Sequence, residues 1–234
     1  MTTRPQEHGA SSPPTARPTR RGWWPMWATV AGTLGFLGSA VIGAAPDVDK
    51  GDPVTPELVD ALPTGAFHLA LVCGYLAVAA LVVLAGLWRR NVEQRFPGSV
   101  GASIVQAGLV ASAAGLSLAY GWKGALSRYL EAGPERATFD ERGTFVYFML
   151  TDFSPFVAWL GVTIACVALA WMAWREALVS RVLGTTVGVV AGVFLAGALV
   201  TGIPGLPAIG SLLLVVLGPW LTFGRHAGIE RVAR

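Results

Sequence analysis

Charged residues are scarce in this chain of 234 residues, at 13% of the sequence. A soluble domain carries about 25%, so the composition excludes an ordinary soluble globular fold. Hydrophobic residues make up 53% of the chain, and the mean hydropathy is +0.57. The few charges lie in short blocks between long apolar runs, as expected for segments that alternate between a bilayer and water. The sequence therefore predicts an all-α fold, a polytopic membrane helix bundle.

Cysteine and histidine are also scarce, and this excludes several chemistries. The two cysteines, Cys73 and Cys166, lie in apolar runs without a Cys-x-x-Cys spacing, so we expect no structural disulfide. A transmembrane haem held by two histidines is excluded, because His68 is the only histidine in an apolar run. Zinc-protease, phosphate-loop and serine-hydrolase motifs are missing. We therefore expect no cofactor and no metal site.

The basic residues do not indicate a nucleic-acid partner, although the pI is about 9.2. They form no stripe and do not alternate with aromatic residues, which is the pattern of a nucleic-acid surface. They flank the apolar runs instead. The predicted partner is the lipid bilayer.

Six apolar runs approach the length of about 20 residues that a membrane crossing needs. The expected spans are 23–44, 64–88, 101–121, 154–174, 182–202 and 208–223. Residues 1–22, rich in Pro, Ser, Thr and Arg, are predicted to form a disordered tail, and 224–234 a second tail. The first run resembles a twin-arginine export signal, but it exceeds the length of a signal core. We interpret it as a retained span.

The fourth apolar run, from Phe145 to Trp174, is too long for one simple span. As a continuous helix it would measure about 45 Å, against a hydrocarbon core of about 30 Å. Within it, Asp152 and Ser154 are followed by Pro155, and a capping residue before a proline is typical of a helix start. We therefore predict a break at Asp152 and a spanning helix that begins near Ser154.

The orientation follows from the basic residues of the connecting segments. The N-terminal tail, 89–100, 175–181 and 224–234 together hold 12 basic and 4 acidic residues, and the alternate segments 45–63, 122–143 and 203–207 hold 5 basic and 9 acidic. The positive-inside rule then places both termini in the cytoplasm. The predicted location is the cell (plasma) membrane.

Asp152 and His68 are the only acidic, basic or histidine side chains inside the apolar runs, and both lie near predicted outer ends. Ionisable groups within a bilayer are functional candidates. Two interpretations stay open: a helix cap and an interfacial histidine, or an outward-facing polar pocket in which the imidazole beside the carboxylate exchanges protons near neutral pH. The outer rim of that pocket would comprise Glu57, Asp60, Lys123 and Arg128.

Small residues recur at every fourth position of the fifth run. They are Gly184, Gly188, Gly192 and Ala196. Small residues let helix backbones approach closely in membranes, so this stripe predicts a helix-packing face. Its partner is either a helix of the same chain or a helix of a second copy.

Two local patterns accompany the order of the spans: Val30 to Gly32 enters the first run, and Arg181 to Gly184 opens the fifth, with an acidic loop before the second. In these features the chain resembles a group of bacterial six-helix integral membrane proteins known only as a domain of unknown function. The resemblance covers Trp27 to Phe223. It implies a fold but no activity.

Three classes of function remain open. A non-enzymatic scaffold, sensor or accessory subunit, with a membrane-protein partner or a second copy of itself, best fits spans that carry almost no charge. A small-solute transporter or channel subunit is the first alternative. The second is a membrane-embedded enzyme that acts on lipid or isoprenoid at the outer face, with Asp152 as the acid.

Overall fold

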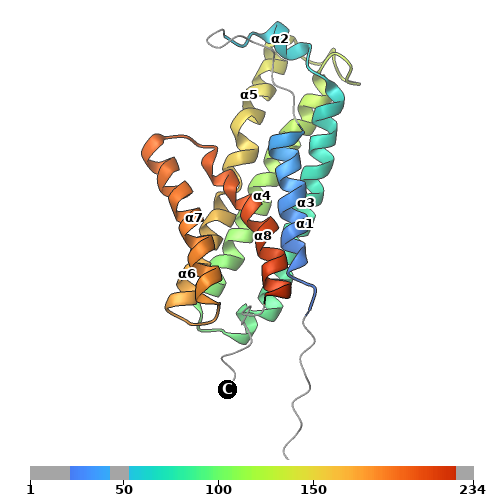
Figure 1. Ribbon diagram of the computed structural model, residues 1–234. Helices are drawn as coiled ribbons and strands as arrows, with labels where there is room; N and C mark the ends of the chain where they lie inside the picture. Colours follow the sequence, from blue (N-terminus) through green and yellow to red (C-terminus); the bar gives the residue numbers. More distant parts are fainter. Residues whose placement is uncertain (1–21, 43–52, 225–234) are drawn as a thin grey trace, which may run out of the picture.

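The computed structural model describes residues 22–42 and 53–224, and these residues form helices joined by turns, without a strand (Figure 1). In chain order the elements are α1 (Met26–Phe36), η1 (Leu37–Val41), α2 (Pro56–Asp60), α3 (Thr64–Asn91), η2 (Glu93–Arg95), α4 (Val100–Tyr129), α5 (Glu141–Val157), α6 (Leu160–Trp174), α7 (Arg181–Thr201), η3 (Leu206–Ala208) and α8 (Ile209–Phe223). η1 is a π-helix, and η2 and η3 are 3-10 helices.

Five helical segments are long and apolar enough to cross a membrane: Thr64–Arg95, Val100–Tyr129, Glu141–Trp174, Arg181–Thr201 and Leu206–Phe223. They correspond to the second to sixth predicted spans. The first predicted span appears as the shorter apolar segment Met26–Val41. Its last predicted residues, 43 and 44, lie outside the described part of the chain, as do both predicted tails apart from their innermost residues. The chain is thus an all-helical bundle with the composition of a membrane-embedded protein.

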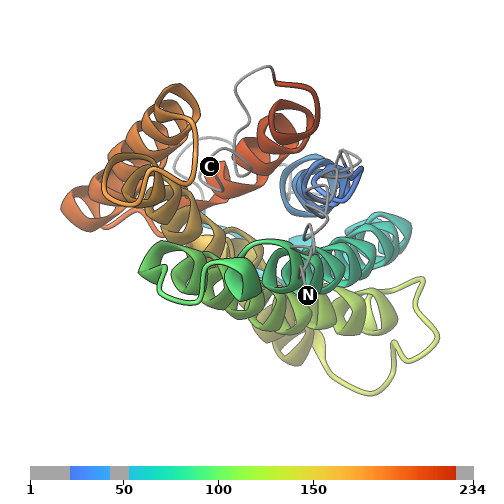
Figure 2. The same cartoon turned by 90° about the horizontal axis from the view of Figure 1, so that it is seen from below.

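The helices form a row with a second layer on it. In the row, α3 packs against α4, α4 against α6 and α6 against α7. α1 and α8 pair with each other, and α1 also contacts α3, so the first and last helices lie side by side on one face of the row (Figure 2). α5 packs against α4, and the short α2 covers the end of α5 (Figure 1).

Side-chain caps explain where two of the long helices begin. The Asp140 carboxylate accepts a hydrogen bond of 2.9 Å from the Gly143 amide at the start of α5. The Ser99 hydroxyl accepts one of 3.0 Å from the Ala102 amide at the start of α4. Both satisfy amides that have no partner inside the helix. The short helix predicted after Thr55 is also present, as α2.

The interruption of the fourth apolar run lies later than predicted. α5 continues through Asp152 and Pro155 to Val157, and the helix is interrupted at Ala158 and Trp159 before α6 begins. Proline lacks the amide that would bond to the preceding turn, so Pro155 weakens the helix without starting a new one. The interruption comes where the Trp159 side chain is fully buried. Asp152 is therefore neither a cap nor a helix start.

Candidate functional site: a buried polar network at a π-helical turn

The first apolar segment changes from α-helix to π-helix within the bundle. The Ile42 amide donates to the Leu37 carbonyl over 2.7 Å, which is the five-residue spacing of a π-helix. Single π-turns inside α-helices frequently mark functional sites. Here two carbonyls close to the transition, those of Gly35 and Gly38, accept hydrogen bonds from side chains of α4.

A chain of hydrogen bonds runs through the interior beside this turn. The indole N–H of Trp159 donates to Ser39 Oγ over 3.3 Å, and Ser39 Oγ lies 2.8 Å from the hydroxyl oxygen of Tyr120. Tyr120 donates to the Gly35 carbonyl over 3.0 Å, so its hydroxyl accepts the proton of Ser39. Ser39 also lies 3.4 Å from the Pro155 carbonyl. The network joins α1, η1, α4, α5 and the interruption before α6.

Glycines make room for the two aromatic rings of this network. A Cβ atom on Gly74 would overlap the Tyr120 ring, and one on Gly35 would overlap the Trp159 ring. A Cβ atom on Gly38 would lie 3.1 Å from Tyr120 Cε1. The rings are therefore seated against bare backbone of α3 and α1, which lets their polar atoms reach Ser39 and Gly35. Close backbone approach through small residues is the usual packing mode in membranes.

Lys123 lies inside the bundle, not on the outer rim where the sequence placed it. Its side chain is 5% exposed, and its ammonium donates to the Gly38 carbonyl over 2.7 Å. The physical reason is that α4 continues to Tyr129, beyond the predicted end of the third span, so Lys123 stays on its buried face one turn after Tyr120. The prediction that Lys123 belongs to an outer rim is thus wrong.

His68 and Asp152, the predicted polar pair, are exposed side chains on α3 and α5. The described residues include no hydrogen bond or ion pair between them, and these two helices make few contacts with each other. The structure thus does not bring the imidazole and the carboxylate together. A pocket built on this pair, and the lipid or isoprenoid enzyme that depended on Asp152, stay predictions.

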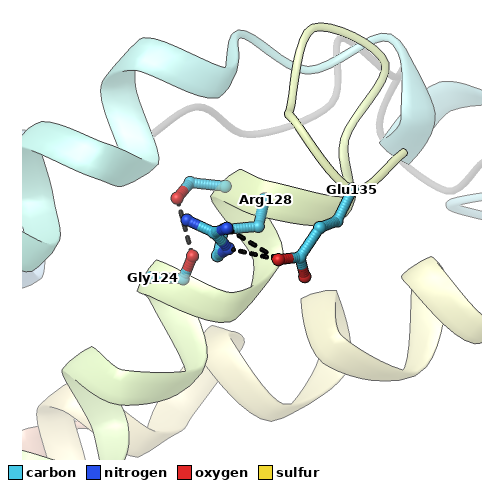
Figure 3. A network of polar contacts seen from close by, with 4 residues as sticks. Gly124, Arg128 and Glu135 are labelled. Carbon is cyan, nitrogen blue, oxygen red and sulfur yellow. Dashed lines mark hydrogen bonds and ion pairs between the residues drawn. The ribbon is translucent and has the colours of Figure 1, made fainter. Parts of the chain in front are cut away.

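The remaining rim residues belong to two separate groups. Arg128 pairs with Glu135 in the turn after α4, with its Nη2 2.6 Å and its Nε 3.1 Å from Glu135 Oε1 (Figure 3). This hydrogen bond holds the pKa of the Glu135 carboxyl below its ordinary value. Glu57 is exposed on α2, where the Thr55 hydroxyl lowers its pKa. Asp60 ends the same short helix.

Only half of the small-residue stripe on α7 is covered. A Cβ atom on Gly184 would lie 2.9 Å from the Leu169 carbonyl of α6, and one on Gly188 would overlap Ala170 of the same helix. A Cβ atom on Gly192, in contrast, would meet no atom of the described chain within 4 Å, and Ala196 is exposed. The stripe thus packs against α6 through its first two members and leaves the last two open.

An apolar cavity of about 30 Å³ lies between α1, α3, α4, α6 and α8. Its walls include Trp24, Trp88, Cys166 and Leu214. Ligand pockets commonly measure about 300 to 1,000 Å³, so this cavity is too small for a substrate. The described residues also contain no group of three or more His, Cys, Asp or Glu side chains that could hold a metal ion.

From the sequence, Lys123 was placed on an outer rim and Ser39 was not singled out, although a signal for the burial of Lys123 was present. The buried face of α4 includes Ser112, Leu116 and Tyr120, and Lys123 follows at the same helical spacing. No family model, curated protein or solved structure matches this chain. The resemblance to six-helix membrane proteins of unknown function therefore stays a prediction.

Proposed function

We propose that the chain is a six-helix protein of the cell membrane with both termini in the cytoplasm. The support is the charge at the two ends of the bundle. The end that holds the start of α1 and the end of α8 (Figure 1) carries five arginines and two glutamates among its described residues: Arg89, Arg90, Arg95, Arg175, Arg181, Glu93 and Glu176. The positive-inside rule assigns this end to the cytoplasm.

The opposite end carries more acidic than basic side chains. Its described basic residues outside the bundle interior are Arg128, Arg136 and Arg142, and its acidic residues are Glu57, Asp60, Glu131, Glu135, Asp140 and Glu141. Met26–Val41 serves as the first crossing in this proposal, because it is apolar and packs beside α8, one of the helices long enough to cross a membrane (Figure 1).

Cysteine labelling of intact cells tests this orientation. In a variant without Cys73 and Cys166, a membrane-impermeant maleimide should label Arg136→Cys and should leave Glu93→Cys unlabelled until the cells are opened. Both positions are exposed or partly exposed. Labelling of Glu93→Cys from outside would refute the orientation, and equal labelling of both positions would refute the single crossing by α4 that separates them.

We infer that the protein acts as a non-enzymatic accessory or scaffold subunit rather than on a substrate of its own. One observation carries this: the stripe on α7 is covered by α6 at Gly184 and Gly188 but is open at Gly192 and Ala196. An uncovered small-residue face in a membrane favours a further helix. The polar groups of Ser39, Tyr120 and Trp159 support the inference, because their hydrogen bonds hold helices together.

The proposed partner is a transmembrane helix of another protein, seated on the open half of α7. A photo-crosslinking amino acid at Ala196 should give a discrete protein adduct in native membranes. The matched control is the same probe at Val110, which is 51% exposed on α4. An adduct of twice the chain's mass would show that a second copy of the chain occupies this face, and the protein would then be a self-assembling scaffold instead of an accessory subunit. Lipid adducts alone at Ala196, as at Val110, would refute the proposal.

A small-solute transporter or channel subunit is the second candidate, and the buried ammonium of Lys123 favours it. This charge contacts the π-turn at Gly38, whose next residue, Ser39, bonds to Trp159 at the interruption before α6. Charged groups beside discontinuous helices are typical of transporter sites. Liposome flux of a solute panel should fall in Lys123→Met, with Asp152→Asn and His68→Ala as comparisons. Equal flux of wild type and Lys123→Met for every solute would refute this candidate.

A further inference from the structure

Two arginines flank the turn that joins α6 to α7. Arg175 follows the last residue of α6, and its guanidinium carbon lies 5.4 Å from the centroid of the Trp171 ring. Arg181 opens α7, and its guanidinium carbon lies 5.2 Å from the centroid of the Trp174 ring. Both separations are within the range of about 6 Å over which a cation is attracted to an aromatic face. The turn therefore presents two positive charges, each on its own aromatic support.

Hydrogen bonds hold both indole rings in place. Trp174 Nε1 donates to Thr185 Oγ1 of α7 over 2.9 Å, and Trp171 Nε1 donates to Glu176 Oε1 over 3.2 Å. The two indoles are 57% and 49% exposed, respectively. Half-exposed tryptophans of membrane proteins settle at the depth of the lipid headgroups. The stacked guanidiniums are thus held at the depth where lipid phosphates lie.

The one acidic residue of the turn bonds to Trp171 and to the start of α4, and to neither arginine. The Glu176 carboxylate accepts hydrogen bonds from Ser99 Oγ and from the Gly101 amide, the latter over 3.1 Å, at the start of α4. A carboxylate there is stabilised by the positive end of the helix dipole. Within residues 22–42 and 53–224, no carboxylate lies within 4.0 Å of Arg175 or Arg181. The two arginines thus remain without a counter-ion from the described chain.

The turn itself is firmly anchored. Leu178 and Val179 are each 5% exposed, and the Leu178 amide donates to the Met172 carbonyl over 3.0 Å. This bond satisfies one of the last carbonyls of α6, and the backbone of Ala177 turns the chain through a left-handed conformation with φ of 54°. The two arginines are therefore attached to a fixed frame, which reduces the entropy lost when they bind a ligand.

We propose that this turn binds the phosphate of an anionic phospholipid through the guanidiniums of Arg175 and Arg181. Guanidinium groups match phosphate oxygens with paired hydrogen bonds. Each basic residue near an anionic membrane surface strengthens binding by about five-fold. The tryptophans set the depth of the arginines, and the phosphate supplies the negative charge that Glu176 does not.

Lipid titration of the purified full-length protein tests the site. Native mass spectrometry in detergent gives apparent dissociation constants for phosphatidylglycerol and for phosphatidylcholine. The double variant R175Q/R181Q should bind phosphatidylglycerol about thirty-fold more weakly than wild type, since two basic contacts are lost. Phosphatidylcholine binding should be unchanged, and added inorganic phosphate at the lipid concentration should not displace phosphatidylglycerol.

The matched control is R136Q/R142Q, which removes the same charge from the opposite end of the bundle. It should bind phosphatidylglycerol as wild type does, and all variants should melt within a few degrees of wild type in detergent alone. Equal affinities of wild type and R175Q/R181Q would overturn the proposal. Equal weakening in both double variants would overturn it too, because it would show attraction to net charge without a site.

Discussion

Removal of the Tyr120 hydroxyl should destabilise the bundle although the ring remains. In Tyr120→Phe the ring keeps its seat against Gly74, and two hydrogen bonds are lost: the one to the Gly35 carbonyl at 3.0 Å and the one with Ser39 at 2.8 Å. Each buried hydrogen bond contributes about 0.5 to 1.5 kcal/mol, and interhelical ones in membranes average about 0.6 kcal/mol. The expected loss is therefore about 1 to 3 kcal/mol.

Ser39 limits this loss, because it keeps a partner in the variant. Its hydroxyl oxygen still accepts a hydrogen bond from the Trp159 indole N–H. Its proton, which no longer bonds to Tyr120, can donate to the Pro155 carbonyl, which lies 3.4 Å away in the structure. The variants Tyr120→Phe and Ser39→Ala should therefore be non-additive. Residues of one network show coupling of about 0.5 to 3 kcal/mol in a double-mutant cycle.

The assay is reversible unfolding in mixed micelles, followed by tryptophan fluorescence. Tyr75→Phe is the matched control, because it removes the same hydroxyl from a ring that is 49% exposed on α3; its effect should stay within about 0.5 kcal/mol. If Tyr120→Phe and Tyr75→Phe lower the free energy of unfolding by amounts that agree within that margin, the network does not stabilise the fold and the reasoning is wrong.

Three further predictions concern packing, backbone strain and charge. Gly188→Ala should lower the free energy of unfolding by about 1 to 3 kcal/mol, because the added Cβ overlaps α6. Gly192→Ala should leave the free energy of unfolding unchanged or raise it by up to about 1 kcal/mol, because its Cβ lies in open space. Ala177→Gly should stabilise by about 0.5 to 1 kcal/mol in the same unfolding assay, since glycine adopts φ of 54° without a Cβ clash; a loss of stability would show that the turn is unstrained. The Arg128 contact lowers the pKa of Glu135, so the contact stabilises the turn above the ordinary pKa of 4.5 and is lost as the pH falls through the lowered value; carboxyl NMR titration should show that pKa return upward in Arg128→Gln.

The long helices could be predicted well from the sequence, and their ends less well. The second, fifth and sixth predicted spans agree closely with α3, α7 and α8, because an apolar run of this length has few other ways to satisfy its backbone in a membrane. The third span was predicted to end before Lys123, since hydropathy falls at the first charge. A helix ends where its backbone bonds and packing end, and α4 continues to Tyr129.

The candidate site was hardly predictable. Ser39 contacts Tyr120 and Trp159, which lie 81 and 120 positions further along the chain. Their meeting depends on the register of distant helices and on glycines that admit the rings. The structure does not bring the predicted pair of Asp152 and His68 together, because the hydropathy of an apolar run does not determine which face of its helix points inward.

Composition and charge placement by themselves determined the class of this protein, the number of long apolar runs and the separation of basic from acidic connections. These follow from transfer free energies, which depend on each residue's chemistry and on segment length. Only the tertiary structure decided that Lys123 is buried against Gly38, that α7 shares half of its stripe with α6, and that Glu176 leaves Arg175 and Arg181 without a counter-ion. Such facts depend on which helix faces meet, and that is set by the packing of the whole bundle.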